Sequence, residues 1–143
     1  MGSEDRKAYE RMVAAFRLND LPNKKQFGLW RLKTYVDVEA VTQLKTRVAE
    51  WIGACFLDEA TIESVTDDSE FKTLDDQLKR EAIRIWLKAK DDPEHTMLAR
   101  MILLACEEHR QKKTRFTGRM SVVLITQRYR DNSIKCGHAT NSV

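Results

Sequence analysis

Apolar residues recur at intervals of three and four along most of the chain, which is the spacing of helices that bury one face. The segment 38–56 follows Asp37 as a predicted N-cap, and it carries an apolar stripe made of Val41, Leu44, Val48, Trp51, Ile52 and Cys55. A similar stripe predicts a helix over 74–90. Further helices are predicted at 3–18 and 24–35, and a short one at 58–65.

The motif Asp-Pro-Glu at 92–94 predicts the start of another helix, because an Asp N-cap followed by Pro is a strong helix start signal. Nine of the ten residues at 97–106 are apolar. A helix that is apolar on all sides is expected to be buried. The sequence therefore predicts an all-α, single-domain bundle of about five to seven helices around a buried central helix at 93–113.

The last apolar run, at 122–126, has the residue types of a strand, but no second strand-like segment is present to pair with it. We favour a short C-terminal helix, and the choice between helix and strand for 120–126 stays open. The helical domain is expected to span 1–130, and 131–143 to be a disordered tail.

Composition describes an ordinary globular chain. The 143 residues are 42% hydrophobic and 33% charged, which is enough to bury a core within one domain. Five glycines and two prolines are few for an all-β fold, and three cysteines do not make a disulfide framework. No apolar run reaches the roughly 18 residues of a membrane span, and the charged N-terminus is not a signal peptide. We therefore expect an intracellular protein, cytoplasmic or nuclear, without a transmembrane segment.

Charge is distributed unevenly along the chain. The net charge is +3, but residues 1–108 sum to −4 and residues 109–143 to +7. A mildly acidic body followed by a basic segment is typical of a protein that binds anionic partners.

No catalytic motif is present: the sequence has no Gly-rich phosphate loop, no HExxH, no G-x-S-x-G and no CxxC. We therefore predict a non-enzymatic protein without a cofactor. Cys106 and His109 share a helix face, and Cys136 and His138 follow in the expected tail, so the four are candidate zinc ligands. A core cysteine and a tail histidine explain the pattern better, and no metal site is predicted.

The start of the chain partly resembles an acylation signal. Met1-Gly2 fits such a signal, but Arg6 stands where it has Ser or Thr. Contact with a membrane surface is therefore not expected.

The basic segment at 110–130, here called the basic arm, carries the functional prediction. Its cations are Arg110, Lys112, Lys113, Arg115, Arg119, Arg128 and Arg130. Arginine suits phosphate because its planar fork donates two parallel hydrogen bonds, and Phe116, Tyr129 and Trp30 are candidates for stacking on bases. The sequence thus predicts sequence-nonspecific binding of nucleic acid, RNA or a single strand. The alternative is a protein interaction or assembly module, an adaptor or matrix-like scaffold that binds another protein or a second copy of itself, with Val122–Ile125 at the interface.

Overall fold

The computed structural model describes the backbone of residues 3–66 and 70–141, and the side chains of 6–66 and 70–130. These residues form α-helices and short 3-10 helices without a strand, which confirms the predicted all-α bundle. The α-helices are α1 (Ser3–Ala15), α2 (Phe27–Glu39), α3 (Lys45–Gly53), α4 (Lys72–Ala89), α5 (Thr96–Gln111) and α6 (Gly118–Asn141). The 3-10 helices are η1 (Lys24–Gln26), η2 (Ala54–Phe56) and η3 (Glu63–Val65).

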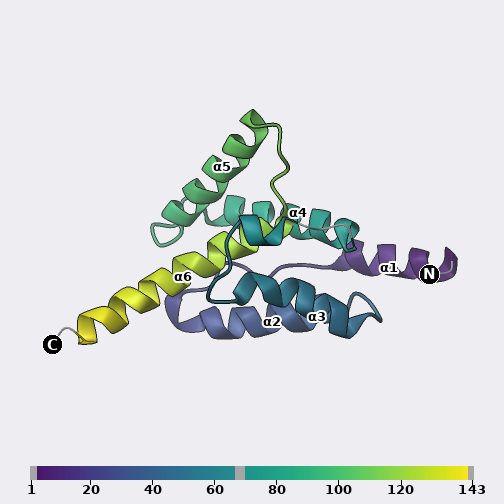
Figure 1. The fold of residues 1–143 in the computed structure, drawn as a ribbon, viewed down its shortest axis with the longest axis horizontal. Helices are drawn as coiled ribbons and strands as arrows, with labels where there is room; N and C mark the ends of the chain where they lie inside the picture. Colours follow the sequence, from purple (N-terminus) through teal and green to yellow (C-terminus); the bar gives the residue numbers. More distant parts are fainter. Residues whose placement is uncertain (1–2, 67–69, 142–143) are drawn as a thin grey trace.

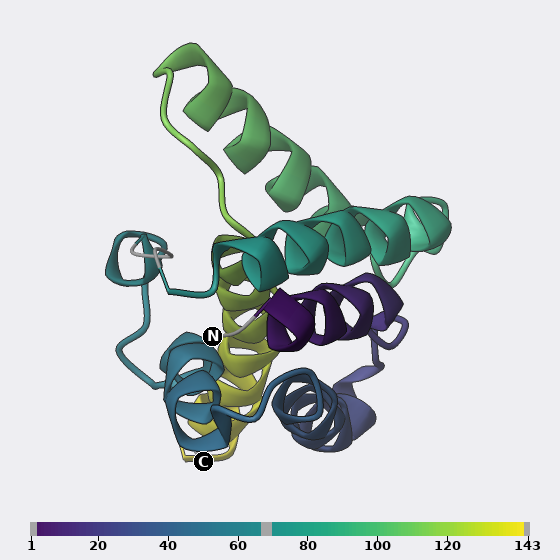
Figure 2. The same ribbon diagram turned by 90° about the vertical axis from the view of Figure 1, so that its right-hand side faces the viewer.

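Helix α6 runs through the middle of the molecule, with α4 on one side and the α2–α3 pair on the other (Figure 1). The view turned by 90° shows the same order, with α1 alongside α4 and α5 projecting away from the body (Figure 2). The projecting end of α5 is its C-terminal end, from which the chain returns to the start of α6.

The central helix is α6 rather than the predicted helix at 93–113. Every residue at 116–126 is buried, and Val122, Val123 and Ile125 have no exposed surface. The open choice at 120–126 is therefore decided in favour of helix. The segment fits the interior because its polar side chains are short or bonded within the chain: Ser121 Oγ, for example, donates to the Gly118 carbonyl at 2.6 Å.

Helix α5 is peripheral, so the predicted burial of 93–113 on all sides is wrong. It buries Leu98, Ala99 and Ile102 against the body, whereas Leu103 and Leu104 are exposed. One side of α5 packs against α4 and α6. Since α6 occupies the centre, the other side of α5 has no layer of the described chain above it.

The predicted continuous helix at 38–56 is interrupted at 40–44, between α2 and α3. This turn contains no glycine or proline, and it is held by packing instead: Val41 and Thr42 are buried. Thr42 Oγ1 accepts the backbone N–H of Leu44 at 3.2 Å, which supports the start of α3. Tertiary burial thus overrides the helical periodicity.

A buried carboxylate fixes the start of α6. Asp75, on α4, has no exposed surface and accepts the backbone N–H groups of Gly118 and Arg119, each at 2.9 Å. A Cβ added to Gly118 would lie 2.4 Å from the Asp75 carbonyl oxygen, so the approach of α6 to α4 requires glycine. The carboxylate also complements the positive end of the α6 dipole.

The predicted division into a domain at 1–130 and a disordered tail at 131–143 stays a prediction, although the backbone of α6 extends to Asn141. Within the described part of the chain, no helix combines the length and the apolar character that crossing a membrane requires.

Candidate functional site

The basic arm is divided between several environments. Three of its cations, Arg110, Lys112 and Lys113, are exposed at the C-terminal end of α5. Arg110 Nε lies 3.5 Å from a Glu107 carboxylate oxygen, and Lys112 Nζ donates to Glu108 at 2.7 Å. The Lys112 hydrogen bond lowers the pKa of Glu108. These pairs partly neutralise the end of the helix.

The next two arginines bind groups of the chain itself. Arg115 hydrogen-bonds Asp76, and its guanidinium lies 3.7 Å from the Asp75 carboxylate. Arg119 is buried, donates from Nη1 to the Trp51 carbonyl at 3.1 Å, and lies over the Trp51 ring at 5.1 Å. The Arg119 guanidinium is thus enclosed between α6 and α3 and is not presented at the surface, where the prediction of phosphate binding expects it.

The arginines at the end of the arm are also held by the fold. Arg130 donates to the carbonyls of Asp58 at 2.9 Å and Phe56 at 3.1 Å. Arg128 is half-buried and lines a small pocket together with Lys24 and His95. The arm thus does not form one continuous row of exposed cations.

The predicted stacking residues belong to the core. Phe116, Tyr129 and Trp30 are all buried. Trp30 Nε1 donates to the Asn19 carbonyl at 3.0 Å, and the Tyr129 ring is stacked on Phe27 with a centroid distance of 5.0 Å. Because their ring faces are covered by the chain, these residues do not offer platforms for bases.

The four residues of the predicted interface, Val122–Ile125, are buried within α6, so they do not form a surface of the folded chain. Of the residues considered as zinc ligands, Cys106 and His109 lie half-buried on α5, with His109 Nδ1 2.9 Å from the Ala105 carbonyl. The side chains of the other two lie outside the described residues. Among the described residues, no three His, Cys, Asp or Glu side chains are grouped as metal ligands.

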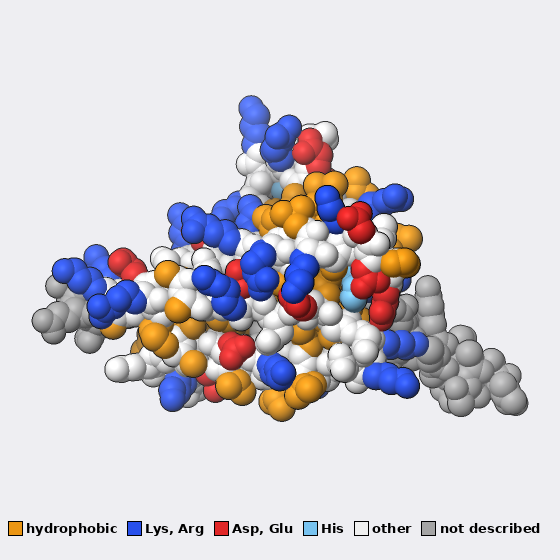
Figure 3. All heavy atoms as spheres, turned by 180° about the vertical axis from the view of Figure 1, so that it is seen from behind, with side chains coloured by type: hydrophobic (Ala, Val, Ile, Leu, Met, Phe, Trp, Pro, Cys, Tyr) orange, Lys and Arg blue, Asp and Glu red, His pale blue; other side chains and the backbone are white. Residues whose placement is uncertain are grey.

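The outer face of α5 is an exposed apolar surface. Met97, Leu103 and Leu104 are exposed by 53%, 52% and 61%, respectively. Arg100 and Glu107 are exposed on the same side, because residues three or four apart share a helix face. Hydrophobic side chains gather over α5 in the space-filling view, below the cations at its C-terminal end (Figure 3). This face, defined by these five residues, is called the α5 outer face below.

The two ends of α5 carry opposite charge. Asp91, Asp92 and Glu94 are exposed just before the helix begins. In the turn before the helix, Asp92 accepts the Glu94 N–H at 3.0 Å, and its second carboxylate oxygen lies 3.1 Å from His95 Nδ1. The opposite end carries the exposed cations of the basic arm, so the helix is electrically polar along its axis.

A second exposed apolar surface lies on α2. Leu29, Leu32 and Val36 follow a spacing of three and four, and each is more than half exposed. The opposite side of α2 buries Trp30 and Val38. The helix therefore has two apolar faces, a signal that is visible in the sequence and that points to a surface beyond the core.

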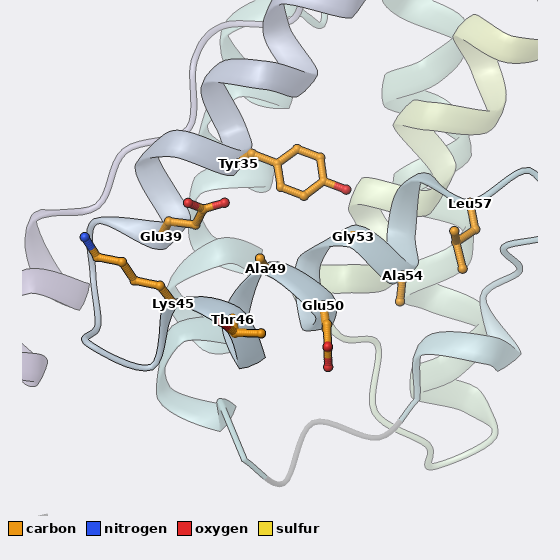
Figure 4. A pocket seen from close by; sticks show the side chains of 9 residues that line it. All are labelled: Tyr35, Glu39, Lys45, Thr46, Ala49, Glu50, Gly53, Ala54 and Leu57. Carbon is orange, nitrogen blue, oxygen red and sulfur yellow. The ribbon is translucent and has the colours of Figure 1, made fainter.

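A groove of about 660 Å³ lies beside this surface, between α2 and α3 (Figure 4). Its floor includes Ala49 and Gly53, and the Tyr35 side chain reaches across from α2, so that a Cβ on Gly53 would lie 2.8 Å from the Tyr35 hydroxyl. Burial raises the pKa of Tyr35. Glu39 and Glu50 stand on opposite walls.

The chain matches no protein-family model, no curated protein sequence and no solved structure. The functional proposal therefore rests on the surfaces described above.

Proposed function

We propose that the protein is a non-enzymatic assembly module that binds protein chains through the α5 outer face. The observation that carries this proposal is the exposure of Met97, Leu103 and Leu104 by more than half on one projecting helix. Covering a large apolar side chain completely contributes about 1.5–3 kcal/mol, so covering three half-exposed ones contributes roughly 3 kcal/mol. Contiguous apolar patches of this kind mark sites of protein interaction.

Binding of nucleic acid by the basic arm has weaker support. The prediction assumed a continuous row of cations, whereas Arg115, Arg119 and Arg130 bond to groups of the chain. Two of the exposed cations at the end of α5 form ion pairs, Arg110 with Glu107 and Lys112 with Glu108. This distribution provides less uninterrupted positive surface than phosphate binding along 110–130 requires.

A display library of amphipathic helical peptides tests the proposal. The wild-type protein should enrich peptides with an apolar stripe, because grooves and exposed helix faces bind amphipathic helices. These peptides should lose binding to Leu104→Glu and keep binding to Leu87→Glu, a matched control that changes an exposed leucine of α4. Peptides that bind the Leu104→Glu variant equally well would contradict the proposal.

Salt dependence separates this function from nucleic-acid binding. Peptide binding to an apolar face should persist or strengthen as salt rises. Anisotropy of a labelled single-stranded oligonucleotide measures the competing function, whose affinity should fall steeply with salt. The assembly proposal would be abandoned for nucleic-acid binding if two results came together. The oligonucleotide would bind with that salt dependence equally well to wild type and Leu104→Glu, and the library would yield no enriched peptide.

A further inference from the structure

We infer that the α5 outer face binds a second copy of this chain, with the two α5 helices antiparallel about a two-fold axis beside Leu103 and Leu104. This inference rests on the proposed function and names its partner. A surface that pairs with its own copy must be self-complementary, so that each residue finds a suitable partner across the axis. Four residues of the α5 outer face have this property, the leucines at its centre and the charged pair Arg100 and Glu107 beside them.

One cation and one anion stand at equal distances on either side of the two central leucines. Arg100 stands three residues before Leu103, and Glu107 stands three residues after Leu104. If Leu104 faces Leu103 of the second copy, Arg100 faces Glu107 of that copy, and the axis repeats the pair. Both side chains are exposed, so they are accessible to each other.

The ends of α5 extend the same pattern. Glu94 precedes Leu103 by nine residues, and Lys113 follows Leu104 by nine. An antiparallel pair brings the acidic N-terminal end of each helix beside the basic C-terminal end of the other. It also opposes the two helix dipoles favourably. A parallel pair would place Arg100 beside Arg100 and Glu107 beside Glu107, so charge disfavours it.

The size of the face sets the strength of the pair. The 16 residues of α5 span about 24 Å. A strip of that length and about 10 Å wide is small beside the roughly 800 Å² per partner of a standard stable interface. We therefore expect a concentration-dependent dimer that dissociates on dilution, rather than a permanent one. Each of its charge pairs then has a measurable share in the affinity.

Sedimentation velocity of the full chain across a wide range of concentration tests the inference. Leu104→Glu should be monomeric at every concentration, because it puts two carboxylates beside the axis. Arg100→Glu and Glu107→Arg should each weaken dimerisation about tenfold, since each replaces two attractive pairs by two repulsive ones. The double variant should return to within about twofold of wild type. Arg80→Glu, an exposed arginine of α4, is the control and should behave as wild type.

The outcomes separate the inference from the proposed function. Circular dichroism should show the same helix content and melting for all variants, since the substituted side chains are exposed. A monomeric wild type, or a dimer that persists in Leu104→Glu, would overturn the inference. The proposed function is tested separately by peptide binding at α5, which would still support it in that case. A double variant no tighter than the single ones would overturn the antiparallel pairing.

Discussion

The carboxylate of Asp75 allows a quantitative test of how α6 is held. It accepts two backbone N–H groups, from Gly118 and Arg119, and a buried position leaves water no access to replace it. The substitution Asp75→Ala removes the acceptor and leaves both donors without it in the interior. The substitution therefore destabilises the first turn of α6, where this helix meets α4.

The expected loss of stability follows from the two hydrogen bonds that Asp75 accepts. A hydrogen bond to a charged group contributes about 1.5–3 kcal/mol, and removing one partner of a buried charged network costs about 3–5 kcal/mol. We therefore expect Asp75→Ala to lower the free energy of unfolding by about 4 kcal/mol. In a domain of this size this corresponds to a fall in Tm of roughly 10–15 °C. Asp75→Asn keeps one acceptor oxygen and should cost about half as much.

Urea unfolding followed by circular dichroism measures these changes. The control is Asp76→Ala, which removes the neighbouring, half-exposed carboxylate that hydrogen-bonds Arg115. An exposed ion pair contributes less than about 1 kcal/mol, so this variant should stay close to wild type. If Asp75→Ala lost less than about 1 kcal/mol, or no more than Asp76→Ala, the reasoning that this carboxylate anchors α6 would be refuted.

Three further measurements follow from the packing. Gly118→Ala should destabilise the protein by about 3 kcal/mol or prevent folding. Gly28→Ala should be neutral or stabilise it by up to about 1 kcal/mol, because a Cβ there meets nothing within 4 Å, and thermal melting compares the two variants. Ile102→Asp should unfold the domain in urea at far lower concentration than wild type, while Leu103→Asp should melt within about 3 °C of it. Burial raises the pKa of the Cys55 thiol to about 12, so a thiol reagent at mild pH should label it quickly after denaturant is added and very slowly before. Because the unfolded chain releases this proton at lower pH than the folded chain, Cys55 also makes folding stability fall as pH rises above about 9 toward 12.

Local periodicity predicted most of the helices, because an apolar stripe at helical spacing needs no knowledge of the partner surface. The helix at 74–90 appears as α4, and the helix at 3–18 appears as α1. Boundaries that depend on tertiary packing were missed. The turn at 40–44 is the clearest case, since the burial of Val41 rather than a turn residue ends the helix there.

The basic arm was misjudged because a sequence does not show which cations find partners inside the fold. Arg119 follows Thr117 and Gly118 and precedes the apolar run at 122–126, so in the sequence it looks like an exposed cation. In the structure its guanidinium donates to the Trp51 carbonyl and lies over the Trp51 ring, and its backbone N–H donates to Asp75. Trp51 and Asp75 lie 68 and 44 residues away in the chain, so no local pattern indicates either contact.

The apolar run at 97–106 predicted a helix covered on every side, and the single chain covers one side of it. Ile102 is buried against the body, whereas Leu104 and Met97 are exposed on the opposite side. Covering such a side chain contributes roughly 1 kcal/mol, a gain that the single folded chain does not make on this side of α5. An antiparallel second copy would cover this side and meet Arg100 with Glu107. The burial of α5 on all sides that the sequence pattern predicts would then occur in the dimer. Helices α4 and α6 would cover one side of α5, and the α5 helix of the second copy would cover the other.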